Sequence, residues 1–240
     1  MSQTTTWQGV NRGPWLALGL ALAFVPLHLY SVFAVDVAAQ PILTLALLLV
    51  QTWLFVGLFI VAHDAIHETL FGRGNSWNDR VGTLIHFLYA GFSFREMKAA
   101  HIDHHDYPGT ERDPDFHASD PRAFWPWYWA FFTRYFGLRQ FATLAVFSTI
   151  YLMLGAEMVN LVVLWAVPSI LSSLQLFYFG TYLTHRHAEE FPDHHNARSN
   201  DMPGWLSLLT CFHFGYHHEH HLYPHEPWWR LPARRAERSP

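Results

Sequence analysis

Three short segments of this sequence are rich in histidine, and each spaces its histidines as one face of a helix requires. The segment "HIDHH", which begins at His101, has histidines at positions i, i+3 and i+4. "HHEHH" near the C-terminus repeats this spacing, and "HDAIH" has two histidines four residues apart. Side chains three and four residues apart lie on the same face of an α-helix. The imidazoles of one cluster can therefore point toward one metal ion, since neutral imidazole binds iron, zinc, copper and nickel.

The number of clustered histidines predicts two metal ions. A site built from imidazoles takes at most about six ligands, and the chain has eight clustered histidines and a ninth at the end of a long apolar stretch. The nine residues are His63, His67, His101, His104, His105, His185, His217, His220 and His221. Acidic side chains beside them, such as Asp64 and Glu219, can orient the imidazoles or offset the positive charge of the ions.

The residues by themselves leave the identity of the metal open. Oxidative attack on an inert C–H bond of a lipid requires a redox metal and O₂, which favours iron over zinc. The affinity series of the divalent metals nevertheless places zinc above iron on similar ligands.

Several other classes of site are excluded by the sequence. It contains no Glu-x-x-His pair, no HExxH helix, no glycine-rich phosphate loop and no GxSxG elbow. The single cysteine, Cys211, excludes an internal disulfide and a thiolate metal cage. A net charge of −4 gives no support to nucleic-acid binding.

The composition places these histidines in a membrane protein. Hydrophobic residues make up 51% of the chain and charged residues only 14%. The stretches 13–35, 37–62, 140–156 and 158–184 contain no Asp, Glu, Lys or Arg. A helix needs about 20 residues to cross roughly 30 Å of hydrocarbon. We therefore predict spans at about 14–35, 41–63, 139–157 and 159–184, and we expect the short third span to extend into neighbouring residues.

The predicted fold is an all-α integral membrane domain over residues 1–240, with four transmembrane helices in two hairpins. Lys and Arg give its orientation: Arg12 precedes the first span, eight lie between Arg73 and Arg139, and six lie from Arg186 onward. Because positive residues stay on the cytoplasmic side, we predict that both termini and segments 64–138 and 185–240 are cytoplasmic. These two segments would form a histidine-rich cap that contains the metal site.

The sequence also gives predictions for the shorter apolar runs and for histidines outside the three clusters. Runs 81–94 and 204–215 suit interfacial or re-entrant helices, and the aromatic run 124–132 suits an interfacial belt. His28 and His86 are predicted to be packed helix histidines rather than ligands. The roles of His213 and His218 stay open.

The order HxxxH, HxxHH, HxxHH between paired spans resembles the integral-membrane fatty acid desaturase and hydroxylase superfamily. Longer strings are more specific, among them "FIVAHDAIH", "PGTERDPDF" and "LTCFHFGYHHEHHLYPHEPWWRLP". These are similar to the bacterial β-carotene ketolases, which place a keto group at C4 of a β-ionone ring. The similarity extends over nearly the whole chain after the first span.

This resemblance implies a di-iron monooxygenase of the bacterial inner membrane. It would use two Fe²⁺ ions, O₂, electrons from reduced ferredoxin and a carotenoid substrate within the bilayer. Two hydroxylations of the C4 methylene would give a geminal diol that loses water to form the ketone. β-Carotene would become echinenone and then canthaxanthin, and the same reaction on zeaxanthin would give astaxanthin.

The resemblance also assigns residues. The eight clustered histidines match iron ligands, and His185 matches an additional ligand after the last span. Thr181 stands where the desaturases have an Asn one turn before that ligand. Asp113 and Asp115 match positions close to the site, with a supporting role.

Two alternatives stay open beside the ketolase. A membrane fatty acid desaturase or hydroxylase, or a carotenoid hydroxylase, would use the same di-iron site on another substrate. A metal transporter or sensor would use the clusters as transient sites, but it requires ionisable groups within the spans. The last three predicted spans contain none between their ends.

Overall fold

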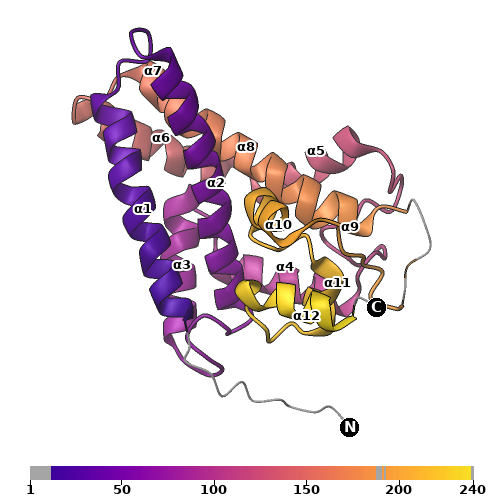
Figure 1. Cartoon of the computed structure of the whole chain (residues 1–240). Helices are drawn as coiled ribbons and strands as arrows, with labels where there is room; N and C mark the ends of the chain where they lie inside the picture. Colours follow the sequence, from indigo (N-terminus) through magenta and orange to yellow (C-terminus); the bar gives the residue numbers. More distant parts are fainter. Residues whose placement is uncertain (1–11, 188–190, 192, 239–240) are drawn as a thin grey trace.

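The computed structural model describes residues 12–187, 191 and 193–238, and all regular structure in these ranges is helical (Figure 1). The helices of the first half are α1 (Gly13–Ala34), α2 (Pro41–Ile66), α3 (Trp77–Ala90), α4 (Phe94–Asp106), α5 (Phe124–Tyr135) and α6 (Leu138–Met153). The predicted all-α class is thus confirmed for the described part of the chain. The N-terminal residues 1–11 and the last two residues, whose cytoplasmic location was predicted, lie outside it.

One long helix follows, over Met158–His185. It consists of α7 (Met158–Leu161), α8 (Val167–Leu176) and α9 (Leu183–His185), joined by π-helical turns at Val162–Ala166 and Phe177–Tyr182. The chain ends in α10 (Gly204–Cys211), α11 (His217–Leu222), a 3₁₀ turn (Trp228–Arg230) and α12 (Leu231–Arg238). π-Helical turns often occur at functional sites, and the second one here directly precedes α9, which ends at His185.

Within the described ranges, three helices are long and apolar enough to cross a membrane: α1, α2 and Met158–His185. They correspond to the first, second and fourth predicted spans. Their outward side chains are largely apolar and exposed, as at Trp15 and Ile42, which suits contact with lipid.

The third predicted span differs from the expectation. Helix α6 has 16 residues, about 24 Å, and it does not extend into its neighbours. It ends at Met153, before Gly155 with its positive φ of 96°. At its other end the chain bends by 72° between α5 and α6, so a fourth span exists only if this bent pair counts as one.

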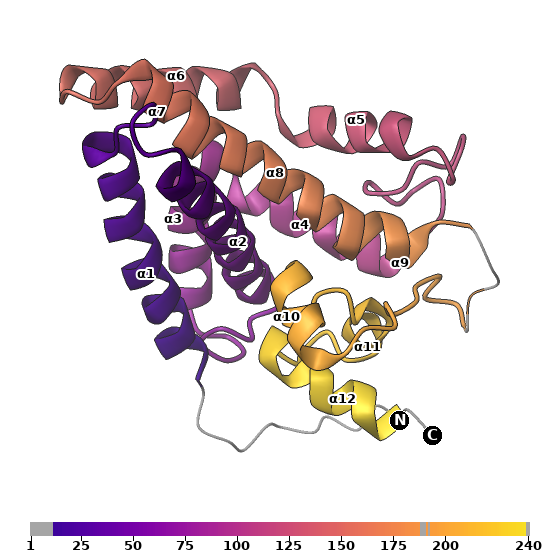
Figure 2. The ribbon, with the colours of Figure 1, turned by 45° about the horizontal axis from the view of Figure 1, so that its top comes forward.

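Helix α2 lies at the centre and packs against α1, α3 and α8 (Figures 1 and 2). Its polar residue Gln51 is fully buried and donates to the carbonyl of Leu164, which ties α2 to the long helix. A buried cluster that includes Val56, Leu176 and Phe212 joins α2, α8 and the segment after α10. The short C-terminal helices and α4 thereby gather around the C-terminal end of α2, where His63 and His67 lie (Figure 1).

The two predicted short apolar runs form α3 and α10. Helix α3 begins at Trp77 and ends at Ala90, and Gly91 caps it in a left-handed conformation with φ of 69°. A Cβ atom at Gly91 would lie 2.5 Å from the hydroxyl oxygen of Thr143 on α6. Glycine is therefore needed both for the backbone conformation and for the close approach to α6.

Candidate metal centre

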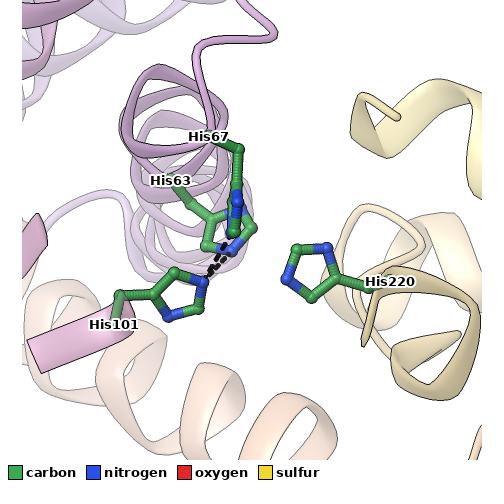
Figure 3. Close-up of side chains that lie close together, drawn as sticks. All are labelled: His63, His67, His101 and His220. Carbon is green, nitrogen blue, oxygen red and sulfur yellow. Dashed lines mark hydrogen bonds between the residues drawn. The ribbon is translucent and has the colours of Figure 1, made fainter. Parts of the chain in front are cut away.

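Four histidines from three separate elements form the first histidine group (Figure 3). His63 and His67 come from the end of α2, His101 from α4 and His220 from α11, and one nitrogen of each lies within 4.8 Å of the others. The Nε2 atom of His101 lies 2.9 Å from Nε2 of His63 and 2.7 Å from Nε2 of His67. Residues far apart in the sequence thus converge at one point.

A second histidine group lies beside the first. It contains His104 of α4, His185 at the end of the long helix, and His217 and His221 of α11. The Nε2 atom of His221 lies 3.2 Å from Nε2 of both His104 and His217. All four side chains are buried.

His105 lies between the two groups. Its Nε2 atom is 3.1 Å from Nε2 of His101 and 2.9 Å from Nε2 of His220, both in the first group. Its ring also stacks on His221 of the second group, at 4.3 Å between centroids. The structure therefore brings all nine sequence-predicted histidines together.

Each HxxHH cluster is divided between the two groups, whereas the spacing suggested one ion for each cluster. In α4, His101 and His105 face the first group and His104 faces the second. In α11, His220 faces the first group and His217 and His221 face the second. The reason is helical geometry: positions i+3 and i+4 differ by about 100° around the axis, so they diverge toward different neighbours.

The nitrogen spacings suit metal ligation. Two imidazole nitrogens that bind one ion at about 2.1 Å, at right angles, lie about 3.0 Å apart. The Nε2 to Nε2 distances within the site run from 2.7 Å for His67 and His101 to 3.2 Å for His217 and His221. In addition, the buried Nε2 of His185 has no hydrogen-bond partner. Two groups of this composition fit two ions of iron or a similar metal.

Polar partners behind the imidazoles fix the orientation of two rings. Nδ1 of His104 donates to both carboxylate oxygens of buried Asp113, at 2.9 and 3.0 Å. Nδ1 of His185 donates to the backbone carbonyl of Asn196 at 2.8 Å. Both bonds leave Nε2 as the nitrogen that faces the second group, an arrangement typical of metal-bound histidine. The predicted supporting position Asp113 thus contacts a member of the site, and Asn196 was not predicted.

Burial keeps most of these imidazoles neutral. It lowers the pKa of His101, His105, His217, His220 and His221 well below the ordinary value, and neighbouring histidines lower these pKa values further. Neutral imidazole is the form that binds metals. For His104, burial lowers the pKa but the hydrogen bond and charge of Asp113 outweigh it, so the pKa of His104 is raised.

Asp115 lies next to the site without contacting a ligand nitrogen. Its carboxylate accepts a hydrogen bond from the hydroxyl of Tyr135, at the end of α5. Burial raises the pKa of Asp115. Tyr135 was not predicted, because a tyrosine in an aromatic-rich helix has no distinguishing sequence signal.

The histidines predicted to be bystanders lie outside both groups. His28 hydrogen-bonds to Gln51 and Tyr151, and His86 bonds through Nδ1 to the carbonyl of Gly82. Of the two left open, His218 hydrogen-bonds to Asp193 and His213 stacks on Tyr216.

An apolar cavity of about 440 Å³ begins at the histidines and continues along the long helix. His63, His101, His104 and His217 line it at one end, with Asp115 and Tyr135 beside them. The long helix contributes Met158, Leu161, Val162, Trp165, Ala166, Ser169, Ile170, Ser173, Leu176 and Thr181, a stripe of one face. From Met158 to Thr181 this stripe is about 35 Å long. Val162 and Ile170 are 48% and 53% exposed, so part of the cavity opens to the surroundings.

The sequence matches a known protein family and several named relatives. Residues 39–148 and 138–240 match the fatty acid desaturase family. The chain is 48% identical over 221 residues to a β-carotene ketolase of Paracoccus sp. (strain N81106 / MBIC 01143). This alignment covers 91% of this chain and 90% of that protein. It is 46% identical over 228 residues to the β-carotene ketolase of Paracoccus sp. (strain PC1), with 94% and 92% covered.

An algal relative is more distant. The zeaxanthin 4-ketolase of Chlamydomonas reinhardtii is 39% identical over 188 residues, which are 76% of this chain and 42% of that protein. No solved structure matches the chain. The family match covers most of the chain and includes all nine histidines, so the chain belongs to the fatty acid desaturase family, in the group that contains the bacterial β-carotene ketolases.

Proposed function

We propose that this protein is a β-carotene ketolase that oxidises the C4 methylene of a β-ionone ring to a ketone. The observation that carries the proposal is the position of two histidine groups at one end of a long apolar cavity. The two relatives that match over at least 90% of both chains are named β-carotene ketolases. A cavity of this shape suits an elongated hydrocarbon with a ring at its end.

The metal centre would contain two iron ions. The first group with His105 would hold one ion, and His104, His185, His217 and His221 would hold the other. When bound, the iron pair would supply the activation of O₂ that oxidation of a C–H bond requires. Reduced ferredoxin is the proposed electron donor.

The chain's own residues position the substrate and exclude water. The stripe on the long helix provides a continuous apolar wall, and Phe214 packs against His63 and His217, 4.6 and 4.8 Å away between ring centroids. These contacts would place a terminal ring of the substrate against the histidines. The C–H bonds of the allylic C4 methylene are weaker than those of an ordinary methylene. The first hydroxyl group weakens the remaining C–H bond on the same carbon.

Asp115 and Tyr135 supply the polar groups of the cavity next to the histidines. After two hydroxylations the ring carbon would carry two hydroxyl groups. Loss of water then removes a proton from one hydroxyl and adds a proton to the other. The Tyr135 hydroxyl donates to Asp115, so the pair would relay that proton: the tyrosine oxygen would take a proton from one hydroxyl of the diol while its own proton moves to Asp115, and the reverse transfer would protonate the hydroxyl that leaves as water.

The membrane arrangement follows from the same proposal. The bent pair α5 and α6 would form a fourth, broken span, which gives two hairpins. Both termini and the histidine-rich cap would lie on the cytoplasmic side of the bacterial inner membrane, where a soluble ferredoxin reaches the metal centre.

Pigment analysis tests the function. Expression in a β-carotene-producing bacterium should convert the carotenoid to echinenone and canthaxanthin, and a zeaxanthin-producing host should yield astaxanthin. Iron should accompany the purified protein. Hydroxylated carotenoids without ketones, or new double bonds in host lipids with unchanged carotenoids, would instead identify a hydroxylase or a fatty acid desaturase. Metal uptake without any oxidised product would identify a transporter.

A further inference from the structure

Three consecutive side chains with metal-binding atoms lie outside the two histidine groups. Asp193, His194 and His195 each offer one ligand atom, and these atoms lie within 4.8 Å of one another. Asp193 and His195 are partly buried, and His194 is exposed. We call these three residues the outer group.

The carboxylate of Asp193 is held by a buried residue. Its Oδ2 accepts a hydrogen bond from Nε2 of His218 at 2.8 Å, and His218 is only 5% exposed. His218 stands in α11 between His217 and His220, one from each histidine group. Oδ1 of Asp193 accepts a hydrogen bond from the backbone N–H of His195 at 3.0 Å. The carboxylate therefore has a fixed position relative to both the metal centre and the outer group.

The two imidazoles of the outer group lie against each other. The ring centroids of His194 and His195 are 4.1 Å apart, with an angle of 35° between the planes. Two imidazoles and a carboxylate form a donor set suited to Zn²⁺, Fe²⁺ and similar cations. Since His194 is exposed, solvent water can complete the coordination.

The outer group is adjacent to the second histidine group. The ring centroid of His195 lies 5.9 Å from that of His221. The next residue, Asn196, accepts the hydrogen bond from His185. The four histidines of the second group are at most 3% exposed, whereas the outer group beside them has one exposed and two partly buried donors.

We propose that the outer group binds a divalent cation of the Zn²⁺ or Fe²⁺ class and passes it to the second histidine group. This inference depends on the proposed function in one respect: it takes the second histidine group to be a metal site. Asp193 and His195 would hold the incoming ion close to His221, and His194 would capture it from solvent.

Equilibrium dialysis of the metal-stripped, full-length protein against Zn²⁺ tests the binding. Wild type should hold one Zn²⁺ per chain more than His194→Ala, a change at an exposed side chain that leaves the core intact. His117→Ala, a loop histidine outside all three groups, serves as the matched control and should keep the wild-type count. Equal counts for wild type and His194→Ala would overturn the proposal.

The Zn²⁺ ions that wild type and His194→Ala both retain report separately on the metal centre. The reason is that His194→Ala leaves all nine histidines of the centre unchanged. A missing centre would lower the count equally in both proteins, whereas a missing outer site abolishes only their difference. The uptake of Fe²⁺ by stripped protein tests the transfer. His194→Ala should take up iron several-fold more slowly and reach the same final content in the centre, and an unchanged rate would refute a role in delivery.

Discussion

Asp113 and His104 form a buried pair in which Nδ1 of the histidine donates to both carboxylate oxygens, at 2.9 and 3.0 Å. Burial alone would raise the pKa of Asp113, but the bond to His104 and its charge reverse this effect, and the pKa of Asp113 is lowered. Asp113 also accepts from the backbone N–H groups of Gly109 and Asp115. The pair therefore connects the loop after α4 to the second histidine group.

Asp113→Asn should weaken this connection while the fold is kept. An amide cannot provide the full negative charge that orients and polarises His104, and loss of such a partner lowers metal affinity by about 10–100-fold. We expect purified Asp113→Asn to contain less iron and to form less ketone. Asp120→Asn, at an exposed carboxylate, is the control, and equal iron in both variants would contradict a positioning role for Asp113.

His220→Ala should abolish ketone formation and remove one iron ion. Its Nε2 lies in the first histidine group, 2.9 Å from Nε2 of His105. His28→Ala provides the comparison, because His28 is buried but contacts Gln51 and Tyr151 rather than the centre. It should retain iron and considerable activity. Equal losses of iron and product in the two variants would mean that the division between ligands and packed histidines is wrong.

Tyr135→Phe should keep the iron and slow the reaction. The change removes the hydrogen bond to Asp115 in the cavity, and a hydrogen bond to a charged group contributes about 1.5–3 kcal/mol, so we expect the rate of ketone formation to fall by about tenfold or more. Tyr128→Phe on the same helix removes a hydroxyl that pairs with Ser173 and should have little effect. Wild-type rates for Tyr135→Phe would exclude the hydroxyl from the reaction.

Ala166→Phe should block the cavity. Ala166 lies in the lining stripe of the long helix, and its side chain is exposed rather than packed in the core. A phenyl ring there would occupy the path of an elongated substrate, so carotenoid oxidation should drop while iron content is unchanged. Val159→Phe adds a similar ring to an exposed position of that helix outside the lining. Equal product from both variants would argue that the substrate does not lie along this face.

Removal of the metal should destabilise the protein. The first histidine group brings imidazole nitrogens as close as 2.7 Å, at Nε2 of His67 and His101. An ion bound only by the folded state stabilises it by about 2.7 kcal/mol at one hundred times its Kd. Chelator treatment in detergent should lower the melting temperature, and added Fe²⁺ should restore it. An unchanged melting temperature, with iron shown to be removed, would contradict metal binding by the folded core.

The sequence alone determined much of the centre, because its signals are local. Helical spacing placed the histidines of each of the three clusters, which begin at His63, His101 and His217, on one helix face. Stretches without charged residues identified α1, α2 and the long helix as apolar. These features depend on neighbours within a few residues, so a single chain contains them.

Only the tertiary structure decided how these parts combine. It divided each HxxHH cluster between two groups, paired His104 with Asp113 and His185 with the Asn196 carbonyl, and brought Tyr135 to Asp115. It also bent the chain by 72° between α5 and α6, just before the third predicted span at 139–157, and ended α6 at Met153, short of the predicted end. Such contacts join residues far apart in the sequence, and they depend on how helices pack against one another, which no local pattern of residue types specifies.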